Sequence, residues 1–260
     1  MTENSMIQVA AKGVTVKSPR EIIAMRQAGK VVALALELLK NTIEPGMRTQ
    51  DLDALAAAEF KRLGAKPAFL GYRGFPATIC VSLNEEIVHG IPGSRKIVEG
   101  DLVKMDVGAI VDGLYGDAAI TVGVGRITEA AQKLIETTRE SLLAGIHEVG
   151  PGVRLGDVGA AIQRYAEARG YSVVREYVGH GIGRRLHEDP SVPNYGIPGR
   201  GLPLRTGMAI AIEPMVNIGT RHTEVLSDEW TVVTADGELS AHFEHTMLVT
   251  DTGVEVLTVC

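Results

Sequence analysis

Cysteine is scarce in this chain of 260 residues, which holds only Cys80 and Cys260. Two cysteines so far apart do not form the framework of a small disulfide-stabilised secreted domain, and they fit a reducing cytoplasm better. Cys80 lies in an apolar segment without a catalytic partner beside it, so we expect its thiol to be packed rather than nucleophilic.

Long apolar runs and long runs of one charge are also missing. The most apolar helical segment, residues 31–39, contains Glu37 and is too short to cross a bilayer. Residues 1–11 have no apolar stretch behind a basic start, which argues against a secretory signal. The net charge of -6, from 26 basic and 32 acidic residues, is spread along the chain and offers no footprint for nucleic acid or anionic lipid. We therefore expect a cytoplasmic protein with no nucleic-acid partner and no membrane partner.

Motifs of several common enzyme classes are absent too. There is no His-Glu-x-x-His zinc motif and no Gly-x-Ser-x-Gly nucleophile elbow. Residues 179–183, Gly-His-Gly-Ile-Gly, loosely resemble a phosphate-binding loop, but the strand-turn-helix context and an acidic residue ~20 positions downstream are missing. We therefore reject a nucleotide-binding function.

What the chain does contain is a weak internal repeat. Its halves share turn signals at a spacing of 106 residues, namely Pro45-Gly46 with Pro151-Gly152 and residues 90–93 with residues 196–199. One inserted residue after the second signal aligns Asp106 with Glu213. Equivalent acids that meet at a pseudo-two-fold axis repel each other unless a cation lies between them. We therefore expect a metal centre in one domain, residues 1–260, built from pseudo-repeats of about 18–123 and 124–250.

Each half is predicted to begin with two helices. Ser18-Pro19-Arg20-Glu21 forms a capping-box signal with proline at the first helical position, and an apolar stripe follows it. A glycine after the second helix of each half is a C-terminal signal. The predicted helices span residues 19–40, residues 49–63 with Thr49 as the cap, residues 128–148 and residues 157–169.

Strand signals follow the helices in each half. Alternating and β-branched residues predict strands over 78–83 and 102–110 in the first half, and over 208–213, 230–234 and 241–250 in the second. Asp112-Gly113 is a two-residue hairpin turn signal. These elements predict an α/β (α+β) fold in which helices pack outside a curved antiparallel sheet.

The predicted hairpin turn also sets the pairing of its two strands. It places Asp117 opposite Gly108 and Asp106 opposite Ala119, so the two acids are diagonal neighbours ~7 Å apart on one face. The opposite face is predicted to be core and carries Val103, Met105, Val107 and Ala109. For the hairpin alone, the ordinary interpretation of Lys104, Asp106 and Asp117 is the solvated side of a half-buried strand pair. The repeat favours a shared ion instead.

Three further polar residues lie where a ligand could be held. Glu213 closes the apolar segment 208–212, and a carboxylate in that place is rarely left unpaired. Glu244 alternates with His242 and Thr246 along one face of a predicted strand, which on its own is typical of an exposed strand edge. His180 lies between glycines in a predicted turn, where a solvated loop histidine is the ordinary interpretation.

Taken in order, these residues resemble the five-ligand signature of methionine aminopeptidases. The matching pieces are Asp106 and Asp117 eleven residues apart, Gly-His-Gly-Ile-Gly at His180, Ile-Glu-Pro-Met at Glu213, Glu-His-Thr at Glu244, and Val-His-Gly-Ile-Pro at residues 88–92. The resemblance covers about residues 18–257. The interval of 31 residues from Glu213 to Glu244 leaves no room for the helical insertion of type II enzymes. With no zinc-binding or proline-rich extension before Ser18, the chain resembles the short bacterial type I form.

The resemblance implies a pita-bread fold and a metalloaminopeptidase. Such an enzyme removes the amino-terminal methionine from nascent proteins and peptides when the second residue is small, through a hydroxide that bridges two divalent ions. The ions would be cobalt, manganese, iron or zinc. The implied ligand roles are chelation of one ion by Asp106, bridging of both by Asp117 and Glu244, and completion of the first by His180 and Glu213. On this assignment the repeat accounts for four of the five ligands, all except His180.

Two substrate-binding histidines and a pocket are implied as well. His89 and His187 match imidazoles that contact the scissile amide, and Glu213 matches a residue that also passes a proton to the leaving amine. The implied methionine pocket consists of Phe69, Tyr72, Phe75, Cys80, Leu186 and Trp230. Phe69 replaces a frequent cysteine and Leu186 a common phenylalanine, so the pocket shape is expected to differ from the usual one. Trp230 could instead be a packing anchor for the excursion 217–240.

Two other functions stay open. Prolidase and aminopeptidase P share the fold and the metal ligands, although they usually carry an extra amino-terminal domain that this chain lacks. A non-catalytic relative that acts as a binding protein would be expected to have lost ligands or histidines, and none is missing here. The expected partner is a peptide or nascent chain, and we expect a monomer.

Overall fold

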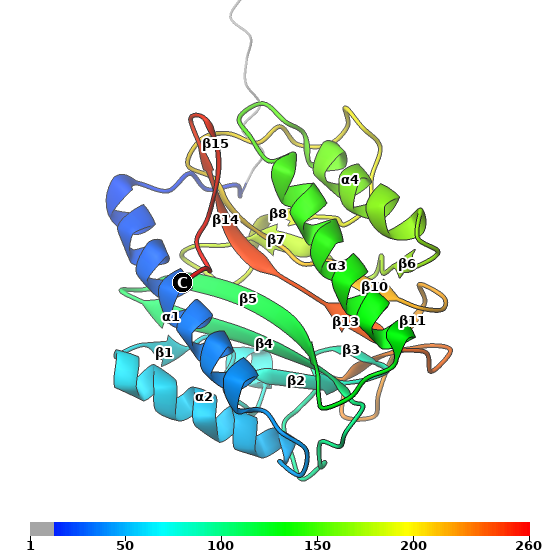
Figure 1. Ribbon diagram of the computed structural model, residues 1–260. Coiled ribbons are helices and arrows are strands. Elements are labelled where there is room, and N and C mark those ends of the chain that lie inside the picture. The colour runs from blue at the N-terminus through cyan, green and yellow to red at the C-terminus, as the bar shows by residue number, and fades with distance from the viewer. Residues whose placement is uncertain (1–12) are drawn as a thin grey trace, which may run out of the picture.

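A long β-hairpin of β4 (Leu102–Val111) and β5 (Leu114–Gly123) runs behind helix α1 (Pro19–Thr42) in Figure 1. Its turn and register are the predicted ones, with Gly108 opposite Asp117 and Asp106 opposite Ala119. The computed structural model describes residues 13–260. The prediction about a secretory signal concerns residues 1–11, which lie outside this range.

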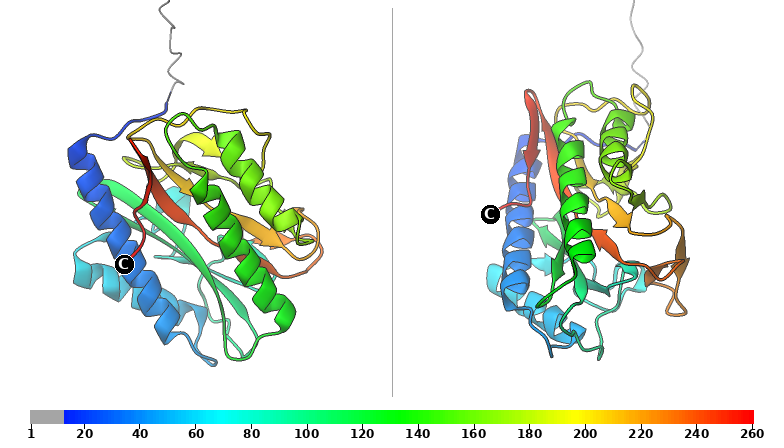
Figure 2. Two further views of the ribbon diagram at one scale, coloured as in Figure 1. Left: turned by 45° about the horizontal axis from the view of Figure 1, so that its top comes forward. Right: turned by 45° about the vertical axis from the view of Figure 1, so that its right-hand side comes forward.

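The helices form two pairs, one in each half of the chain. They are α1 with α2 (Thr49–Leu63), and α3 (Glu129–His147) with α4 (Leu155–Glu167), and the short 3-10 helix η1 (Tyr72–Gly74) follows the first pair. In Figures 1 and 2, α1 and α3 run roughly parallel in front of the strands. The arrangement confirms the predicted two helices at the start of each half.

The remaining strands are short, and every pairing between the named strands is antiparallel. The first half adds β1 (Lys66–Pro67), β2 (Cys80–Leu83) and β3 (Glu86–Val88). The second half adds β6 (Ser172–Val173), β7 (Gly179–Gly181), β8 (Glu188–Val192), β9 (Ala209–Ile212), β10 (Met215–Asn217), β11 (Thr223–Val225), β12 (Val232–Thr234), β13 (Ser240–His242), β14 (His245–Thr250) and β15 (Gly253–Val256). The predicted antiparallel α+β fold is therefore confirmed.

The first two helix starts confirm one predicted cap and correct another. Ser18 caps α1 through the predicted capping box with Glu21. Thr49 is the first residue of α2 rather than its cap, because the Asp51 carboxylate accepts a hydrogen bond from the backbone N–H of Arg48. The acid three positions into the helix, and not the hydroxyl, satisfies the free N–H group at this end.

The second half uses the same device. Asp157 accepts a hydrogen bond from the Arg154 N–H, so α4 begins at Leu155, two residues before the predicted start. It also ends two residues early, at Glu167. α3 spans Glu129–His147, one residue shorter at each end than the predicted 128–148, because Thr128 is its N-cap.

The internal repeat appears in the structure as repeated hydrogen bonds. The Gly46 N–H donates to the Ile97 carbonyl, and the Gly152 N–H donates to the Leu204 carbonyl, each at 2.8 Å. Both glycines have positive φ angles, which a glycine adopts without strain. Each helix pair is therefore tied at its connecting turn to the segment that leads into the strands of its own half.

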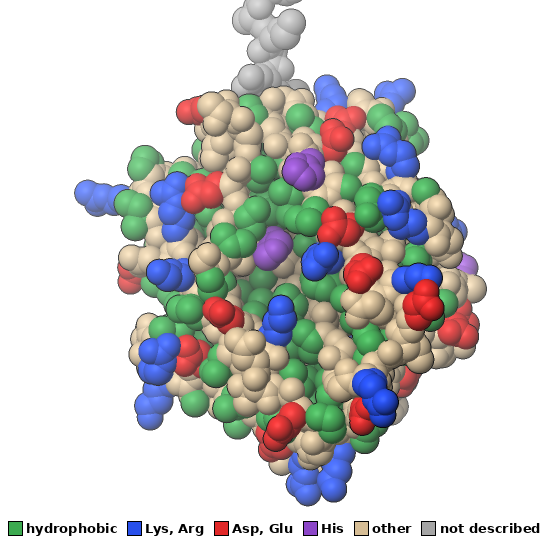
Figure 3. All heavy atoms as spheres, in the orientation of Figure 1, with side chains coloured by type: hydrophobic (Ala, Val, Ile, Leu, Met, Phe, Trp, Pro, Cys, Tyr) green, Lys and Arg blue, Asp and Glu red, His purple; other side chains and the backbone are tan. Residues whose placement is uncertain are grey.

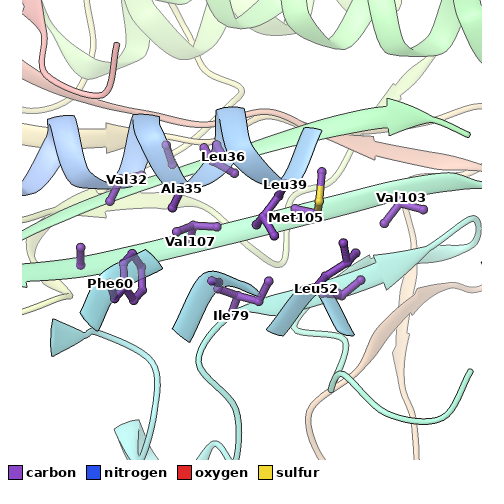
Figure 4. Close-up of a cluster of buried hydrophobic side chains, with 14 of the residues drawn as sticks. Val32, Ala35, Leu36, Leu39, Leu52, Phe60, Ile79, Val103, Met105 and Val107 are labelled. Carbon is purple, nitrogen blue, oxygen red and sulfur yellow. The ribbon is translucent and has the colours of Figure 1, made fainter. Parts of the chain in front are cut away.

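The largest apolar cluster lies between the first helix pair and one face of the hairpin (Figure 4). Leu36 and Leu39 of α1 and Phe60 of α2 pack there against Met105 and Val107 of β4. The prediction that this face of the hairpin is core is confirmed, because Val103, Met105, Val107 and Ala109 are all fully buried.

The opposite face of the hairpin is buried as well, so its interpretation as a solvated surface is wrong. Lys104 and Asp117 are 2% and 4% exposed. The Lys104 ammonium donates hydrogen bonds to the carbonyls of Asn84 and Ser240, which brings a strand of the second half over this face. Because both faces are covered, Asp117 is buried and Asp106 is half-buried.

On the face shown in Figure 3, acidic and basic side chains are interspersed among apolar ones. Among residues 13–260, no helix combines the length and the apolar character needed to cross a bilayer.

Glycine allows α1 to approach the hairpin closely. A Cβ atom at Gly116 of β5 would lie 2.8 Å from the backbone nitrogen of Gly29 in α1, a distance that real Cβ contacts do not reach. The neighbouring atoms belong to backbone, so they cannot move aside as a flexible side chain would.

We predict that Gly116→Ala lowers the free energy of unfolding by about 1–3 kcal/mol, because the added methyl group overpacks this helix-strand contact. Gly150→Ala is the matched control, since a Cβ there would meet only atoms at 3.9 Å or beyond. Urea unfolding of both variants measures the effect. Equal stability of the two variants would contradict the close approach.

Candidate metal centre

Two acids enter a buried pocket from the hairpin. Asp106 of β4 and Asp117 of β5 project from the face opposite the apolar core, as their register requires. Cys80 pairs with Asp106 across β2 and β4 and is 5% exposed. Burial and the nearby carboxylates raise the pKa of the Cys80 thiol well above its usual value, which suits the prediction of a packed side chain that is not a nucleophile.

Glu213 and His180 approach the same pocket from the second half. Glu213 follows the end of β9, and its carboxylate Oε1 lies 3.6 Å from Nε2 of His180. His180 is not in a turn as predicted but in the middle of β7, paired with Ala211 of β9. The glycines on either side permit this pairing, because a Cβ at Gly179 would overlap the Ala211 carbonyl.

The His180 ring is oriented by its own strand. Its Nδ1 lies 2.9 Å from the Gly181 carbonyl, which can only accept a hydrogen bond, so Nδ1 carries the proton. Burial lowers the pKa of His180 to about 3, and the ring is therefore neutral. Nε2 is left with a free lone pair that faces the acids, which is the form in which histidine binds a metal.

Glu244 lies where the predicted strand 241–250 is interrupted. Strand β13 ends at His242 and β14 begins at His245, and between them Glu244 pairs with Ala119 of β5. Its backbone N–H donates to the Ala119 carbonyl at 2.9 Å. Glu244 is 2% exposed, so the interpretation as an exposed strand edge is wrong. This pairing joins the hairpin of the first half to the strands of the second.

These donor atoms fit divalent ions. Among the described residues, Asp106 Oδ1, Asp117 Oδ1 and Glu244 Oε1 are buried without a hydrogen-bond partner. Ligand atoms of Asp117, His180 and Glu244 lie within 4.8 Å of one another. Unpartnered buried carboxylates are costly unless a cation or another donor meets them. Carboxylate oxygens with one imidazole form the kind of donor set that binds first-row transition ions.

The pKa values of the acids report their crowding. Burial raises the pKa of Asp106 to about 7. Burial, and then the charges of Glu244 and Asp106, raise the pKa of Asp117 well above its usual value. The pKa values of Glu213 and Glu244 are raised in the same direction, again first by burial. All four shifts have the sign expected for carboxylates held together without a counter-ion.

The structure brings every predicted site residue to one pocket. Its lining consists of Phe69, Tyr72, Arg73, Phe75, Cys80, His89, Asp106, Asp117, His180, Leu186, His187, Glu213, Trp230 and Glu244. Arg73 is the only lining residue that the sequence did not indicate. It lies in η1 with a positive φ angle, and its guanidinium is 5.4 Å from the centre of the Tyr72 ring.

The apolar wall of the pocket is built by aromatic contacts. Trp230 meets Phe75 edge to face with 5.0 Å between ring centres, so it lines the pocket as well as packing. Phe69 is 7% exposed and lies over β4 at Gly108, where a Cβ would be 2.6 Å from its ring. Gly108 therefore leaves the space that the bulky Phe69 side chain occupies. Leu186 is 2% exposed in the same cluster.

His89 and His187 lie beside this wall. His89 has a positive φ angle of 61°, a conformation that is strained for a residue other than glycine and is often found at functional sites. Burial and then His187 lower the pKa of His89 to about 4. Nδ1 of His187 is 2.8 Å from the Tyr72 hydroxyl, and when that hydroxyl donates to it, Nε2 carries the proton. Both rings are thus neutral hydrogen-bond donors near neutral pH.

His242 was not among the predicted site residues. It is 1% exposed, and Nε2 lies 3.9 Å from carboxylate oxygens of both Glu213 and Glu244. Its alternation with Glu244 along the predicted strand was the available signal.

The comparisons with known proteins agree with this geometry. Residues 23–251 match metallopeptidase family M24. "Methionine aminopeptidase 1" of Bacillus subtilis is 53% identical over 242 residues, which are 93% of this chain and 98% of that protein. A crystal structure of methionine aminopeptidase from Thermotoga maritima has a TM-score of 0.94 at 51% identity and covers 95% of this chain and 100% of its own.

A more distant likeness concerns the fold alone. The prolidase from Pyrococcus furiosus has a TM-score of 0.76 at 23% identity, with 94% of this chain and 65% of that chain covered. Together with the methionine aminopeptidase structure, it confirms the predicted pita-bread fold.

The raised pKa values of the acids predict how the stability of the protein changes with pH once a chelator has removed divalent ions. A carboxylate whose pKa is higher in the folded state binds more protons there than in the unfolded state. The free energy of unfolding should therefore fall as pH rises from about 4 through about 7, the value for Asp106. Urea unfolding at several pH values, with chelator and with saturating Co²⁺, measures this loss.

The matched control is Asp117→Asn, which removes one of the crowded charges and should flatten the pH dependence of the chelated protein. Co²⁺ should restore the stability of the unsubstituted protein at high pH. A chelated protein that is no less stable at pH ~8 than at pH ~5 would contradict the crowding of the acids.

Proposed function

Because the chain belongs to metallopeptidase family M24, we propose that it is a methionine aminopeptidase, a metal-dependent hydrolase that removes an amino-terminal methionine. The observation that carries this proposal is the convergence of four acids and His180 on one pocket that is also lined by His89, His187 and an aromatic wall. Relatives about half identical over nearly the whole chain bear the same activity in their names. We propose that residues 1–260 form a single catalytic domain.

Asp106, Asp117, His180, Glu213 and Glu244 would hold two divalent ions. When bound, the ions supply Lewis acidity, which lowers the pKa of water and polarises the scissile carbonyl. Four carboxylates carry a charge of about -4, and two divalent ions would bring the cluster close to neutral. The oxygen-rich set with imidazole suits cobalt, manganese, iron or zinc.

The methionine side chain would enter the apolar part of the pocket. Its walls are Phe69, Tyr72, Phe75, Cys80, Leu186 and Trp230. An unbranched thioether fills such a slot well and makes favourable sulfur–aromatic contacts. Because Cys80 is buried and protonated, it offers surface for packing and no charge.

The chain's own groups would then handle the amide. Neutral His89 and His187 each have an N–H group to donate to the carbonyl oxygen or amide of the bound peptide, which stabilises charge as it develops. Glu213, whose pKa is raised, suits the transfer of a proton to the leaving amine. Tyr72 holds His187 in position through the contact with Nδ1.

We also propose a preference for the second residue of the substrate, a cellular compartment and an oligomeric state. The proposed substrate has a small second residue. Aromatic rings enclose His89, with Tyr177 at 5.7 Å and Trp230 at 6.4 Å between ring centres. Both cysteines are free, which suits action in the cytoplasm on peptides or nascent chains. We propose that the enzyme acts as a monomer.

The activity test is cleavage of Met-Ala-Ser after reconstitution with Co²⁺, Mn²⁺ or Fe²⁺, beside Ala-Pro and Gly-Pro peptides. We expect release of methionine from the first and negligible release of residues before proline. Preferential cleavage of the proline peptides would identify a proline-directed peptidase instead. Failure to cleave any peptide by folded, metal-loaded protein would favour a non-catalytic binding protein.

A second experiment distinguishes the two histidines from the metal ligands by measuring activity and metal content. His187→Ala and His89→Ala should each lower kcat/KM by about 10²-fold, the usual effect of losing one oxyanion donor, while metal content is unchanged. Asp106→Asn should lower activity and also the metal bound per protein, as measured by elemental analysis. His147→Ala is the control, because His147 is exposed at the end of α3. Unchanged metal content in Asp106→Asn would contradict its role as a ligand.

A further inference from the structure

The strand registers show which residues are equivalent in the two halves. In the hairpin, Gly108 pairs with Asp117. In the second half, the position equivalent to Gly108 is Met215, two residues after Glu213, and Met215 pairs with His242 across β10 and β13. His242 is therefore the counterpart of Asp117.

The same registers correct the predicted symmetry of the ligands. Asp106 is equivalent to Glu213, and Asp106 pairs with Ala119. The pairs Ile212–His245 and Met215–His242 place Glu244 opposite Glu213. Glu244 is therefore the counterpart of Ala119. Asp117 and Glu244 are consequently not equivalent, and the repeat relates only Asp106 and Glu213 among the five predicted ligands. The prediction that the repeat accounts for four ligands is wrong.

A pair of threonines confirms the equivalence of His242 and Asp117. Thr121 Oγ1 accepts from the His242 N–H at 2.9 Å and donates to the His242 carbonyl at 2.7 Å. Thr246 Oγ1 accepts from the Asp117 N–H at 3.0 Å and donates to the Asp117 carbonyl at 2.7 Å. The backbones of His242 and Asp117 are thus held by the same two kinds of hydrogen bond. Their side chains project from equivalent strand positions at the interface between the halves.

The surroundings of the His242 ring indicate a missing partner. The residue is 1% exposed, and neither Nδ1 nor Nε2 has a hydrogen-bond partner among residues 13–260. Nε2 lies 3.9 Å from Glu213 Oε2 and 3.9 Å from Glu244 Oε2. These distances exceed the ~2.7–3.2 Å of a hydrogen bond. They fit donors around one ion, because ligands at ~2.0–2.2 Å from a metal lie up to ~4 Å apart.

The two imidazoles meet different oxygens of one carboxylate. His180 Nε2 faces Oε1 of Glu213, whereas His242 Nε2 faces Oε2. Ligand atoms of Glu213, His242 and Glu244 lie within 4.8 Å of one another, separately from the group of Asp117, His180 and Glu244. Glu244 is common to both groups.

We propose that His242 is a metal ligand, so that this centre binds its divalent ions with two imidazoles instead of the one predicted. The proposal rests on the metal centre of the proposed function and adds a sixth protein ligand to it. Imidazole favours cobalt, iron and zinc over manganese, so the second ring should bias the centre towards those ions.

The test compares unsubstituted protein, His242→Gln and His242→Asn, each stripped with chelator and reloaded. Glutamine keeps a polar side chain of similar size but is a much poorer ligand for Co²⁺, and asparagine guards against misfolding of one variant. Titration should show Co²⁺ binding weakened at least tenfold in both variants, with Mn²⁺ binding weakened less. X-ray absorption of the Co²⁺ protein should count fewer coordinated imidazoles in the variants.

Other outcomes overturn the proposal. An unchanged imidazole count, even with lower activity, would mean that His242 only positions Glu213 and Glu244. Equal losses of Co²⁺ and Mn²⁺ affinity without a change in the count would give the same conclusion. If the unsubstituted protein binds Co²⁺ and cleaves Met-Ala-Ser while the variants match it, only this inference fails. If the unsubstituted protein binds no metal, the proposed function fails with it.

Discussion

The gathering of four carboxylates in one pocket where the two halves meet is the constraint on which the rest of the structure depends. Asp106 and Asp117 come from the hairpin, and Glu213 and Glu244 come from strands of the second half. Brought together without a cation, they repel each other and bind protons far more tightly than free acids do. A pair of divalent ions would offset the repulsion among these carboxylates and so hold the two halves together.

The fold is arranged so that one face of the hairpin packs against the core and the other carries two of the proposed metal ligands, Asp106 and Asp117. The apolar cluster under α1 and α2 fixes β4 and β5, and the threonine hydrogen bonds and the Ala119–Glu244 pairing fix the second half against them. The pocket with the aromatic wall lies beside the acids, because Gly108 leaves space for Phe69 and the glycines of β7 bring His180 close to β9. The apolar core and two of the proposed metal ligands therefore share a single strand pair.

Local signals predicted the parts of the fold that local interactions determine. Asp112-Gly113 set the hairpin register, and Ser18 with Glu21 set the start of α1. The interruption at Glu244 and the placement of His180 on a strand could not be predicted, because both depend on pairing with strands distant in sequence. The candidate ligands were found through their order along the chain, since each alone has an ordinary interpretation. Alternation with Glu244 was the one sequence signal for His242, and Arg73 had none, because the carboxylates and rings around them come from segments distant in sequence.

The most direct measurement is the number of protons released when Co²⁺ binds to chelated protein at pH ~6.5, obtained by calorimetry in buffers of different ionisation enthalpy. If a cation replaces protons that the crowded acids otherwise hold, binding should release about one or more protons, and Asp117→Asn should release fewer. Binding of Co²⁺ without proton release, or no binding at all, would contradict the account.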